Sequence, residues 1–267
     1  MKALVPLYLQ QFKTTFATMV QYRASLFIWM IGHVLEPLVY LVVWSVVAES
    51  GGGSAGGYTT AEFAAYFIVL MLVENTSYTW IMYEYDYRVR EGLLSPALLR
   101  PVHPIHADIA DNISSKAITM PFMLVVAVVL AAIFHPVMSP RGWALLAAIP
   151  ALVLAFLLRF LLEWTLAQAA FWTTRVSAIN QSYFVLVLFL SGQVAPLSLF
   201  PHALQIAASI LPFRWMLGFP VELILGRLSP TDALLGLAAQ VVWVGLAYGL
   251  MRVIWRAGIR LYSAVGA

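Results

Sequence analysis

A few charged and polar residues interrupt the long apolar stretches of this sequence, and these are the residues that could do chemistry. Arg159 and Glu163 are four residues apart, so on a helix they share a face and can neutralise each other. The others are the polar residues Glu36, Glu74, Asn75 and Gln193, and Pro196 lies three residues after Gln193. Glu36, Glu74 and Asn75 could line a path for a solute or hold a dimer, although hydrogen bonds between packed helices are the more common role. A path or gate could also open at Gln193 and Pro196. Because a charge at mid-bilayer costs about 2.5 to 3.5 kcal/mol, we expect the polar residues to face protein or water.

The sequence lacks the residue patterns of common catalytic sites. Its three lysines follow Met1, Phe12 and Ser115, so it has no Gly-Lys-Ser/Thr motif to cradle phosphates, which excludes ATP hydrolysis by this chain. The five histidines form no His-Glu-x-x-His pair for zinc, and cysteine is absent. We therefore expect no catalytic residue, no metal and no cofactor in this chain. The sequence also shows no sign of nucleic-acid binding.

The composition is that of a membrane protein. Apolar residues make up 62% of the 267 residues and charged residues only 10%, whereas about 25% of a soluble domain is charged. A helix needs about 20 apolar residues to cross about 30 Å of hydrocarbon. Six stretches of roughly this length predict an all-α, polytopic fold: 26–48, 63–82, 118–134, 143–162, 182–200 and 233–254. We expect the third helix to begin outside the membrane, over Asp108 to Lys116.

Six spans return both ends of the chain to one side, and the basic residues identify that side. One set of connecting segments carries 11 of the 15 basic residues, the other carries Arg141, Arg214 and Arg227, and Arg159 lies in a span. The first set consists of Lys2, Lys13, Arg23, Arg88, Arg90, Arg100, Lys116, Arg175, Arg252, Arg256 and Arg260. Because cytoplasmic segments are rich in Lys and Arg, we expect a multi-pass protein of the inner (plasma) membrane with both termini in the cytoplasm.

Three segments depart from the simple pattern of spans. Residues 1–25 alternate apolar and polar residues at helical spacing, which predicts an amphipathic helix in the cytoplasmic interface with membrane lipid as its partner. An extension of the first span is the alternative. The apolar stretch 203–225 contains two prolines and an arginine, so we expect two short segments there instead of a span. Gln193 and Pro196 predict a kink in the fifth span.

The cytoplasmic connection between the second and third spans, residues 83–117, has a distinctive composition. Charged residues and tyrosines at its start favour a helix leaving the membrane, Gly92 permits a break, and Pro96 can begin a short helix that ends before Pro101. Exposed leucines would let this knob fit a groove on a soluble partner. These leucines are Leu93, Leu94, Leu98 and Leu99. A loop packed on its own bundle is the alternative.

At this point the sequence resembles the ABC-2-type permeases, the membrane subunits of ATP-binding-cassette exporters. Arg90-Glu91-Gly92-Leu93-Leu94 and Leu98-Leu99-Arg100-Pro101 are similar to the family's motifs after the second span. Leu211-Pro212-Phe213-Arg214-Trp215-Met216 is similar to its segment before the last helix. The order of the elements extends the resemblance over the whole chain, with an interfacial helix, a six-helix domain over 26–267 and a long first cytoplasmic connection.

The resemblance implies a coupling role, in contact with an ATPase, for eight residues: Arg90, Glu91, Gly92, Leu93, Leu94, Leu98, Leu99 and Arg100. It also implies two ATPase subunits that bind ATP and Mg, a second permease chain that is either the same or related, and an outer re-entrant hairpin, 199–231, acting as a gate. The expected function is export of an amphipathic or hydrophobic substrate such as a lipid, a lipid-linked glycan or a drug. A secondary transporter driven by an ion gradient is the alternative, but the sequence has no convincing internal repeat and few acids in its spans.

Overall fold

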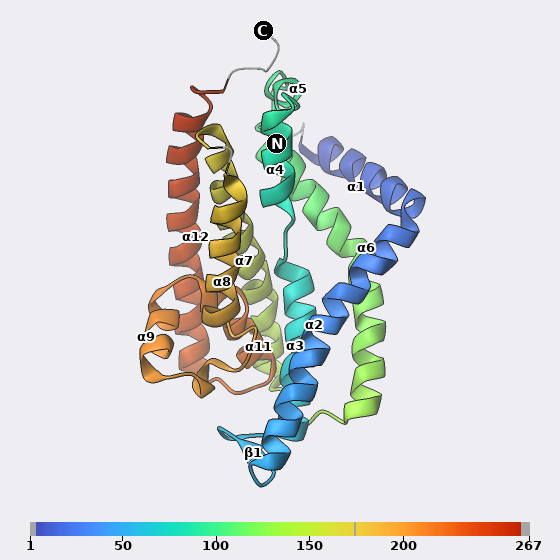
Figure 1. Ribbon diagram of the computed structural model, residues 1–267, viewed down its shortest axis with the longest axis vertical. Coiled ribbons are helices and arrows are strands. Elements are labelled where there is room, and N and C mark those ends of the chain that lie inside the picture. Colours follow the sequence, from blue (N-terminus) through green and yellow to red (C-terminus); the bar gives the residue numbers. More distant parts are fainter. Residues whose placement is uncertain (1–3, 174, 263–267) are drawn as a thin grey trace.

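The computed structural model describes residues 4–173 and 175–262, and it is predominantly helical (Figure 1). Its elements are α1 (Leu4–Gln21), α2 (Arg23–Ser50), β1 (Ser54–Ala55), β2 (Tyr58–Thr59), α3 (Thr60–Ser77), α4 (Ile81–Arg90), α5 (Ser95–Leu98), α6 (Ile105–Phe134), α7 (Gly142–Ala167), η1 (Gln168–Phe171), α8 (Val176–Leu190), η2 (Leu197–Leu199), α9 (His202–Ile210), α10 (Phe213–Met216), α11 (Gly218–Ile224) and α12 (Pro230–Gly258). The two short strands pair antiparallel, with Ser54 opposite Thr59.

The bundle has two distinct ends. The start of α1, the short helix α5 and the last turns of α12 lie at one end, and the β1–β2 hairpin lies at the other (Figure 1). These are called the α5 end and the hairpin end below. The short helices α9 and α11 lie in the half nearer the hairpin end.

Helix α1 runs across the long axis of the bundle, and the chain turns sharply at Tyr22 into α2 (Figure 1). Phe12 and Phe16 on α1 are exposed, whereas Thr15 is buried and donates a hydrogen bond to Asp111 of α6 at 2.6 Å. An amphipathic helix in a membrane interface also exposes an apolar face, and the interfacial position of α1 stays a prediction. Helix α1 ends at Gln21, a few residues before the predicted boundary at 25.

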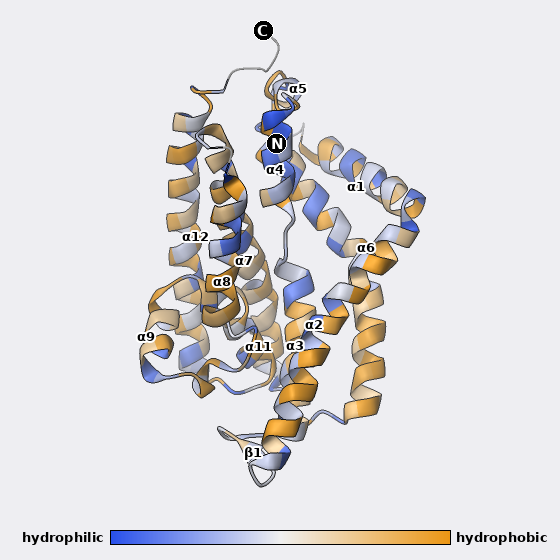
Figure 2. Cartoon of the chain, viewed as in Figure 1, coloured by the Kyte–Doolittle hydropathy of each residue, from blue (hydrophilic) through white to orange (hydrophobic). Residues whose placement is uncertain are grey.

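Four helices among the described residues are long and apolar enough to cross a membrane, namely α2, α6, α7 together with η1, and α12. They contain the first, third, fourth and sixth predicted spans, and α6 includes the stretch from Asp108 to Lys116 as expected. Figure 2 shows the apolar residues that cover α2 and the hairpin-end half of α6. The second and fifth predicted spans correspond to shorter helices, α3 with 18 residues and α8 with 15. The count of six spans stays a prediction.

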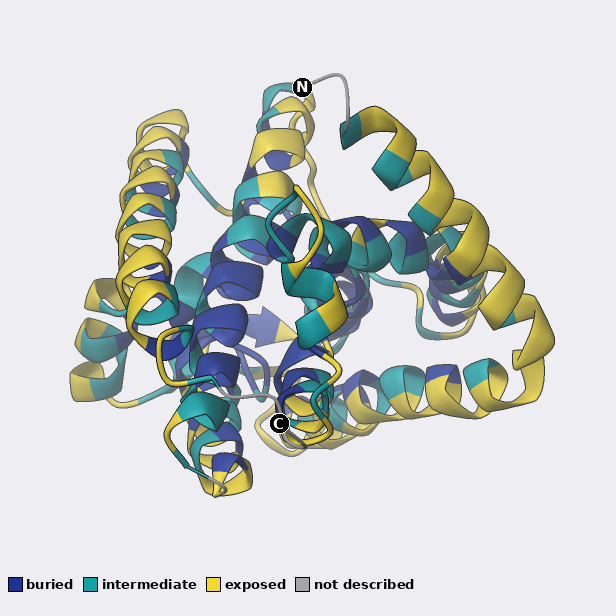
Figure 3. Ribbon diagram, turned by 90° about the horizontal axis from the view of Figure 1, so that it is seen from above, coloured by how far each residue is buried: buried dark blue, intermediate teal, exposed yellow. Residues whose placement is uncertain are grey.

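Helix α3 is enclosed by its neighbours. It packs against α2, α6, α7 and α11, and 13 of its 18 residues are buried. Figure 3 shows the buried residues gathered in the middle of the bundle. The helix ends at Ser77, and residues 78–80 are not helical before α4 begins at Ile81. The predicted continuous span over 63–82 is therefore wrong in its last part, where the backbone is broken.

The fifth predicted span is also wrong in its boundaries. Helix α8 begins at Val176 and ends at Leu190, so Gln193 and Pro196 follow a helix end and do not kink a continuous helix. Gly192 adopts a left-handed conformation with φ of 91°, and the phenol of Tyr66 donates to its carbonyl at 2.7 Å. A Cβ at this glycine would lie 2.6 Å from the Tyr66 oxygen. Only glycine lets the chain turn here against Tyr66.

The segment after α8 forms more helices than expected. The stretch 203–225 contains most of α9 and all of α10 and α11, instead of two segments. The loop that follows α11 is tied to the start of α3, because Arg227 pairs with Glu62 at 2.7 Å and lies 3.7 Å from the ring centroid of Tyr58. Glu62 also completes a capping box with Thr59 at the first turn of α3.

Helix α11 packs on α12 at Gly236, which supplies a test of this packing. A Cβ at Gly236 would lie 2.0 Å from the buried ring of Phe219, whereas a Cβ at Gly245 of the same helix meets open space. We expect Gly236→Ala to lower the free energy of unfolding by about 1–3 kcal/mol, because the ring must move within a packed core. Gly245→Ala, the matched control, should leave stability equal or slightly higher. Thermal unfolding in detergent compares the two variants, and equal melting temperatures would contradict the close packing.

Candidate functional site

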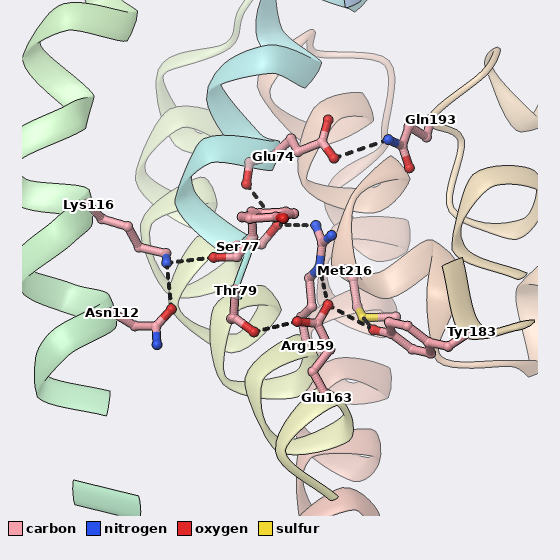
Figure 4. A network of polar contacts seen from close by, with 11 residues as sticks. Glu74, Ser77, Thr79, Asn112, Lys116, Arg159, Glu163, Tyr183, Gln193 and Met216 are labelled. Carbon is pink, nitrogen blue, oxygen red and sulfur yellow. Dashed lines mark hydrogen bonds and ion pairs between the residues drawn. The ribbon is translucent and has the colours of Figure 1, made fainter. Parts of the chain in front are cut away.

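Buried polar groups surround the point where α3 ends (Figure 4). Arg159 and Glu163 lie on one face of α7, and Arg159 Nε donates to Glu163 Oε1 at 2.8 Å, as their spacing predicted. Their side chains are 2% and 0% exposed. The phenol of Tyr183 on α8 donates to the same Glu163 oxygen at 3.3 Å. An ion pair buried this deeply needs additional partners, because removal from water costs each ion several kcal/mol.

The end of α3 provides two of those partners. The hydroxyl of Ser77 accepts a hydrogen bond from Arg159 at 3.3 Å, and the hydroxyl of Thr79 donates to Glu163 Oε2. The ring of Tyr78 lies 5.2 Å from the Arg159 guanidinium carbon, a cation–π distance. Three successive residues of α3 and its broken end therefore contact the α7 pair.

The break also serves Lys116, which comes from the other side on α6. Its Nζ donates to the Tyr78 carbonyl at 2.7 Å and to Asn112 Oδ1 at 3.4 Å. In a continuous helix the Tyr78 carbonyl would bond the amide four residues later, so the break leaves it available. Non-helical backbone inside a membrane is tolerated where it is buried in protein or lines a cavity. Thr79 is buried, and Tyr78, Thr79 and Trp80 all line a cavity.

Three of the polar residues singled out in the sequence meet each other. Gln193 Nε2 donates to Glu36 Oε1 at 3.0 Å and to Glu74 Oε1 at 3.1 Å, and Figure 4 shows the second of these contacts. The bridge joins α2, α3 and the segment that follows α8. Glu74 and Gln193 are buried, whereas Glu36 is exposed on the surface of the single chain.

Asn75 and Pro196 lie near this bridge in sequence but do not take part in it. Asn75 turns toward α6, where its amide oxygen accepts a hydrogen bond from the hydroxyl of Thr119 at 3.2 Å. Pro196 is buried and directly precedes η2. The role of these two residues, and of the three in the bridge, in a path or gate stays a prediction.

Two cavities open beside the polar network. The carboxylate cavity has a volume of about 480 Å³ and is lined by Glu36, Glu74, Arg159 and Gln193, among others. The lysine cavity has a volume of about 470 Å³, and its polar lining includes Asn75, Asp111, Asn112, Lys116 and Thr119.

Three aromatic side chains line both cavities and form one cluster. Trp29 and His33 lie one turn apart on α2, with ring centroids 4.1 Å apart. The ring of Tyr78 lies 4.8 Å from His33 and 5.6 Å from Trp29. The cluster therefore borders both the carboxylate cavity and the lysine cavity.

The chemistry of the two cavities is that of binding. The lysine cavity presents the amino group of Lys116 together with the carboxylates of Glu84 and Asp111. The carboxylate cavity offers acceptors to hydroxyl or amino groups beside the guanidinium of Arg159. In residues 4–173 and 175–262, no group of three or more His, Asp and Glu side chains could hold a metal ion. Both cavities combine these polar groups with apolar walls, which suits an amphipathic molecule.

The 83–117 connection lies at the α5 end and is firmly attached to the bundle. Arg88 on α4 pairs with Glu84 and with Asp108 of α6, both at 2.5 Å. The other oxygen of Asp108 accepts a hydrogen bond from the indole of Trp164 on α7 at 2.9 Å. Asp108 is 2% exposed and thereby joins three helices.

The tip of the connection forms as predicted, with one correction. Gly92 breaks the chain with φ of 68°, and α5 follows at Ser95–Leu98. Leu93 and Leu99 are exposed, Leu99 at 88%, and Leu98 is half-buried. The expectation that Leu94 is exposed is wrong, because its side chain packs in the core and is 1% exposed. Arg90, Glu91 and Arg100 are exposed.

The base of the connection is held by aromatic packing around His103. Its ring lies 4.8 Å from Trp255 and 5.7 Å from Trp164, centroid to centroid. Burial in this position lowers the pKa of His103, and the nearby His106 lowers it further. His103 Nδ1 accepts a hydrogen bond from the backbone N–H of Ile105 at 3.3 Å. The imidazole is therefore neutral at physiological pH, with its proton on Nε2.

Sequence reasoning missed several residues of the network. Trp29 and His33 precede Glu36 by seven and three residues, so the three occupy one face of α2, and this polar stripe in an apolar run was a readable signal. Lys116 was predicted to lie in the cytoplasmic connection, because it precedes the apolar run of the third span, so its contact with Tyr78 was not foreseen. The contacts of Thr79 and Tyr183 with Glu163 could not be predicted from the sequence, because threonine and tyrosine are common throughout membrane helices.

A family profile described as "ABC-2 family transporter protein" matches residues 34–266. The chain belongs to the ABC-2 transporter family. The resemblance found in the motifs of the 83–117 connection is thereby confirmed. For this ABC-2 family chain, membership indicates a membrane-embedded, generally non-catalytic subunit of an ABC transporter that associates with ATPase partners. A search of curated proteins found no match.

The buried ion pair of this ABC-2 family chain can be tested by a mutant cycle. Arg159→Leu leaves Glu163 charged and without its ion partner, so we expect a loss of about 3–5 kcal/mol in the free energy of unfolding. The double variant Arg159→Leu/Glu163→Leu removes both charges and should recover most of that loss. Thermal or denaturant unfolding in detergent measures the cycle. Additive losses in the double variant would show that the two side chains do not depend on each other.

Proposed function

We propose that this chain is the permease subunit of an ATP-driven exporter and works with separate ATPase subunits. It moves an amphipathic or hydrophobic substrate, such as a lipid, a lipid-linked glycan or a drug, out of the cytoplasm. The ATP and Mg belong to the partner subunits, two of which serve two permease chains. Family membership supports this proposal in its coarse form.

The observation that carries the proposal is that α5, at the tip of the 83–117 connection, is joined to the buried polar network both by the chain itself and by polar contacts. The chain runs from the network through residues 78–80 directly into α4 and α5. Arg88 on α4 and Trp164 on α7 both contact Asp108 of α6. A tilt of α4 would therefore strain its contacts with α6 and α7. A force applied at α5 would therefore reach the segment whose Tyr78 carbonyl and Thr79 hydroxyl hold the buried charges.

The proposal includes six spans, with α3 and α8 as the two short ones. Helix α3 is enclosed by protein, which supports its crossing with fewer apolar residues than a lipid-facing helix. The α5 end is assigned to the cytoplasm, because Arg252 and Arg256 of α12 lie at this end together with the basic residues of α4. Residues 199–231, which are distinct from the β1–β2 hairpin, form the outer re-entrant hairpin on the side of the membrane opposite the α5 end.

A second permease chain, the same or related, is proposed to pack against the face that carries Glu36. This carboxylate is exposed on α2 of the single chain, and a carboxylate facing lipid at this depth is costly. A partner there would enclose the carboxylate cavity between two chains. The mixed polar and apolar lining of both cavities supports an amphipathic substrate that passes the Trp29, His33 and Tyr78 cluster.

The orientation can be tested with single cysteines, because the chain has none of its own. We expect Ser54→Cys in the hairpin to react with a membrane-impermeant maleimide on intact cells. Arg100→Cys at the α5 end should react only after the membrane is permeabilised. Both positions are exposed in the single chain. Labelling of Arg100→Cys in intact cells would reverse the proposed orientation.

The coupling role of α5 can be tested by a charge at its most exposed leucine. Leu99→Asp should weaken co-purification of an ATPase subunit at least about tenfold, since an exposed apolar anchor of a groove is lost, without changing the melting temperature of the chain. Ile210→Asp places the same charge on an exposed residue of α9 near the other end and serves as the control. Leu94→Ala, in contrast, should lower stability because Leu94 is buried.

Transport itself decides between the proposal and its alternative. Vesicles containing the chain with its ATPase should move a lipid or drug probe only with ATP and Mg, and Leu99→Asp should reduce this movement. Normal transport and assembly in Leu99→Asp would contradict the role of α5. Transport by the isolated chain in a proton or sodium gradient would contradict the exporter as a whole.

A further inference from the structure

A third cavity, of about 730 Å³, lies between the start of α6, α7 and the last turns of α12. Its lining residues include His103 and His106 near the start of α6, Leu157 on α7, and Val244, Arg252 and Arg256 on α12. It shares no lining residue with the carboxylate or lysine cavity. We call it the arginine cavity.

The charge of the arginine cavity is uncompensated. Arg252 and Arg256 are exposed, and among the described residues neither forms an ion pair, whereas Arg88, Arg159 and Arg227 each do. No Asp or Glu belongs to the described lining of the cavity. The guanidinium carbon of Arg252 lies 5.8 Å from the ring centroid of Tyr248. Two arginines one turn apart in a site without carboxylates form a binding site for an anion such as phosphate.

Histidines add hydrogen-bonding capacity beside the arginines. His106 lines the cavity, and its Nδ1 is buried without a hydrogen-bond partner in the part of the chain that the structure describes. His103 uses Nδ1 as an acceptor for the backbone of Ile105, which leaves Nε2–H as its donor. Such groups favour a ligand with several acceptor oxygens.

The remainder of the cavity is apolar and elongated, which distinguishes an amphiphile from a free ion. Leu157, Leu161, Val244 and Met251 form its apolar walls. Val244 and Arg256 are twelve residues apart on α12, or about 18 Å along the helix. This distance is close to half of the hydrocarbon thickness, about 15 Å. Trp255 lies next to Arg256 at the charged end of the cavity, and aromatic side chains of this kind mark the level of lipid headgroups.

We propose that the arginine cavity binds an anionic phospholipid from the leaflet at the α5 end. The phosphate lies against Arg252 and Arg256, and an acyl chain lies along the walls formed by α7 and α12. The lipid thereby contacts His103, which follows α5 and packs on Trp164 and Trp255. It supports the base of the segment that carries the α5 knob. This proposal depends only on a membrane-embedded chain and is independent of the proposed transport direction.

The test uses the full chain in detergent micelles with added lipid. Phosphatidylglycerol and phosphatidylcholine are titrated separately, with thermal unfolding and native mass spectrometry as readouts. Arg252→Gln/Arg256→Gln removes the two charges of the cavity. Arg260→Gln removes an exposed arginine one turn further along the chain, outside the cavity lining, and is the matched control. Inorganic phosphate and glycerol phosphate test the anion without acyl chains.

We expect phosphatidylglycerol to raise the melting temperature and to remain bound in native spectra, while phosphatidylcholine does neither. The double variant should weaken phosphatidylglycerol binding roughly thirtyfold, since each arginine near anionic lipid contributes a factor of about five. Arg260→Gln should bind as the wild type does. An unchanged phosphatidylglycerol effect in the double variant, an equal loss in Arg260→Gln, or the same stabilisation by inorganic or glycerol phosphate would overturn the proposal.

Discussion

Much of the arrangement depends on one constraint, which is that the Arg159–Glu163 pair is almost entirely removed from solvent, with side chains 2% and 0% exposed. An ion pair on a helix face supplies one favourable contact, but a guanidinium and a carboxylate together have more donor and acceptor positions than one contact fills. Three further contacts come from Ser77, which accepts from Arg159, and from Thr79 and Tyr183, which donate to Glu163. These come from elements far apart in the sequence. The pair therefore fixes how α3, α7 and α8 approach one another.

The same constraint explains why α3 is short. A continuous helix would use its own backbone groups internally and could not present a free carbonyl to Lys116. By ending at Ser77, the chain offers side-chain and backbone groups to charges from both α6 and α7. Polar cavities then form beside the break, because the surrounding helices cannot close completely around non-helical backbone and charged side chains. The two cavities therefore lie beside the groups with which the bundle neutralises its charges.

The sequence predicted what depends on local pattern. Long apolar runs located α2, α6, α7 and α12, and the combination of Gly92 with Pro96 located α5. The break at Tyr78 was not predictable in this way, because residues 78–80 contain neither glycine nor proline. Gln193, Glu36 and Glu74 were chosen separately, and their contact across 157 and 119 residues depends on the tertiary fold. Leu94 shows the same limit. Nothing in the local sequence distinguishes it from the other three leucines of the segment, and only the tertiary packing determines that its side chain is buried.

The break after α3 has a mechanical consequence. A continuous helix from Thr60 to Arg90 would be rigid and would transmit a force from the α5 end to the hairpin end. Because three non-helical residues lie in between, α4 and α3 are separate helices: α4 is held by α6 and α7 through Asp108, whereas α3 is enclosed by its own neighbours. The break includes Tyr78, whose ring packs against Trp29 and His33. A displacement of α4 would therefore act first on residues 78–80, beside the cluster of Trp29, His33 and Tyr78, before it reached the capped start of α3.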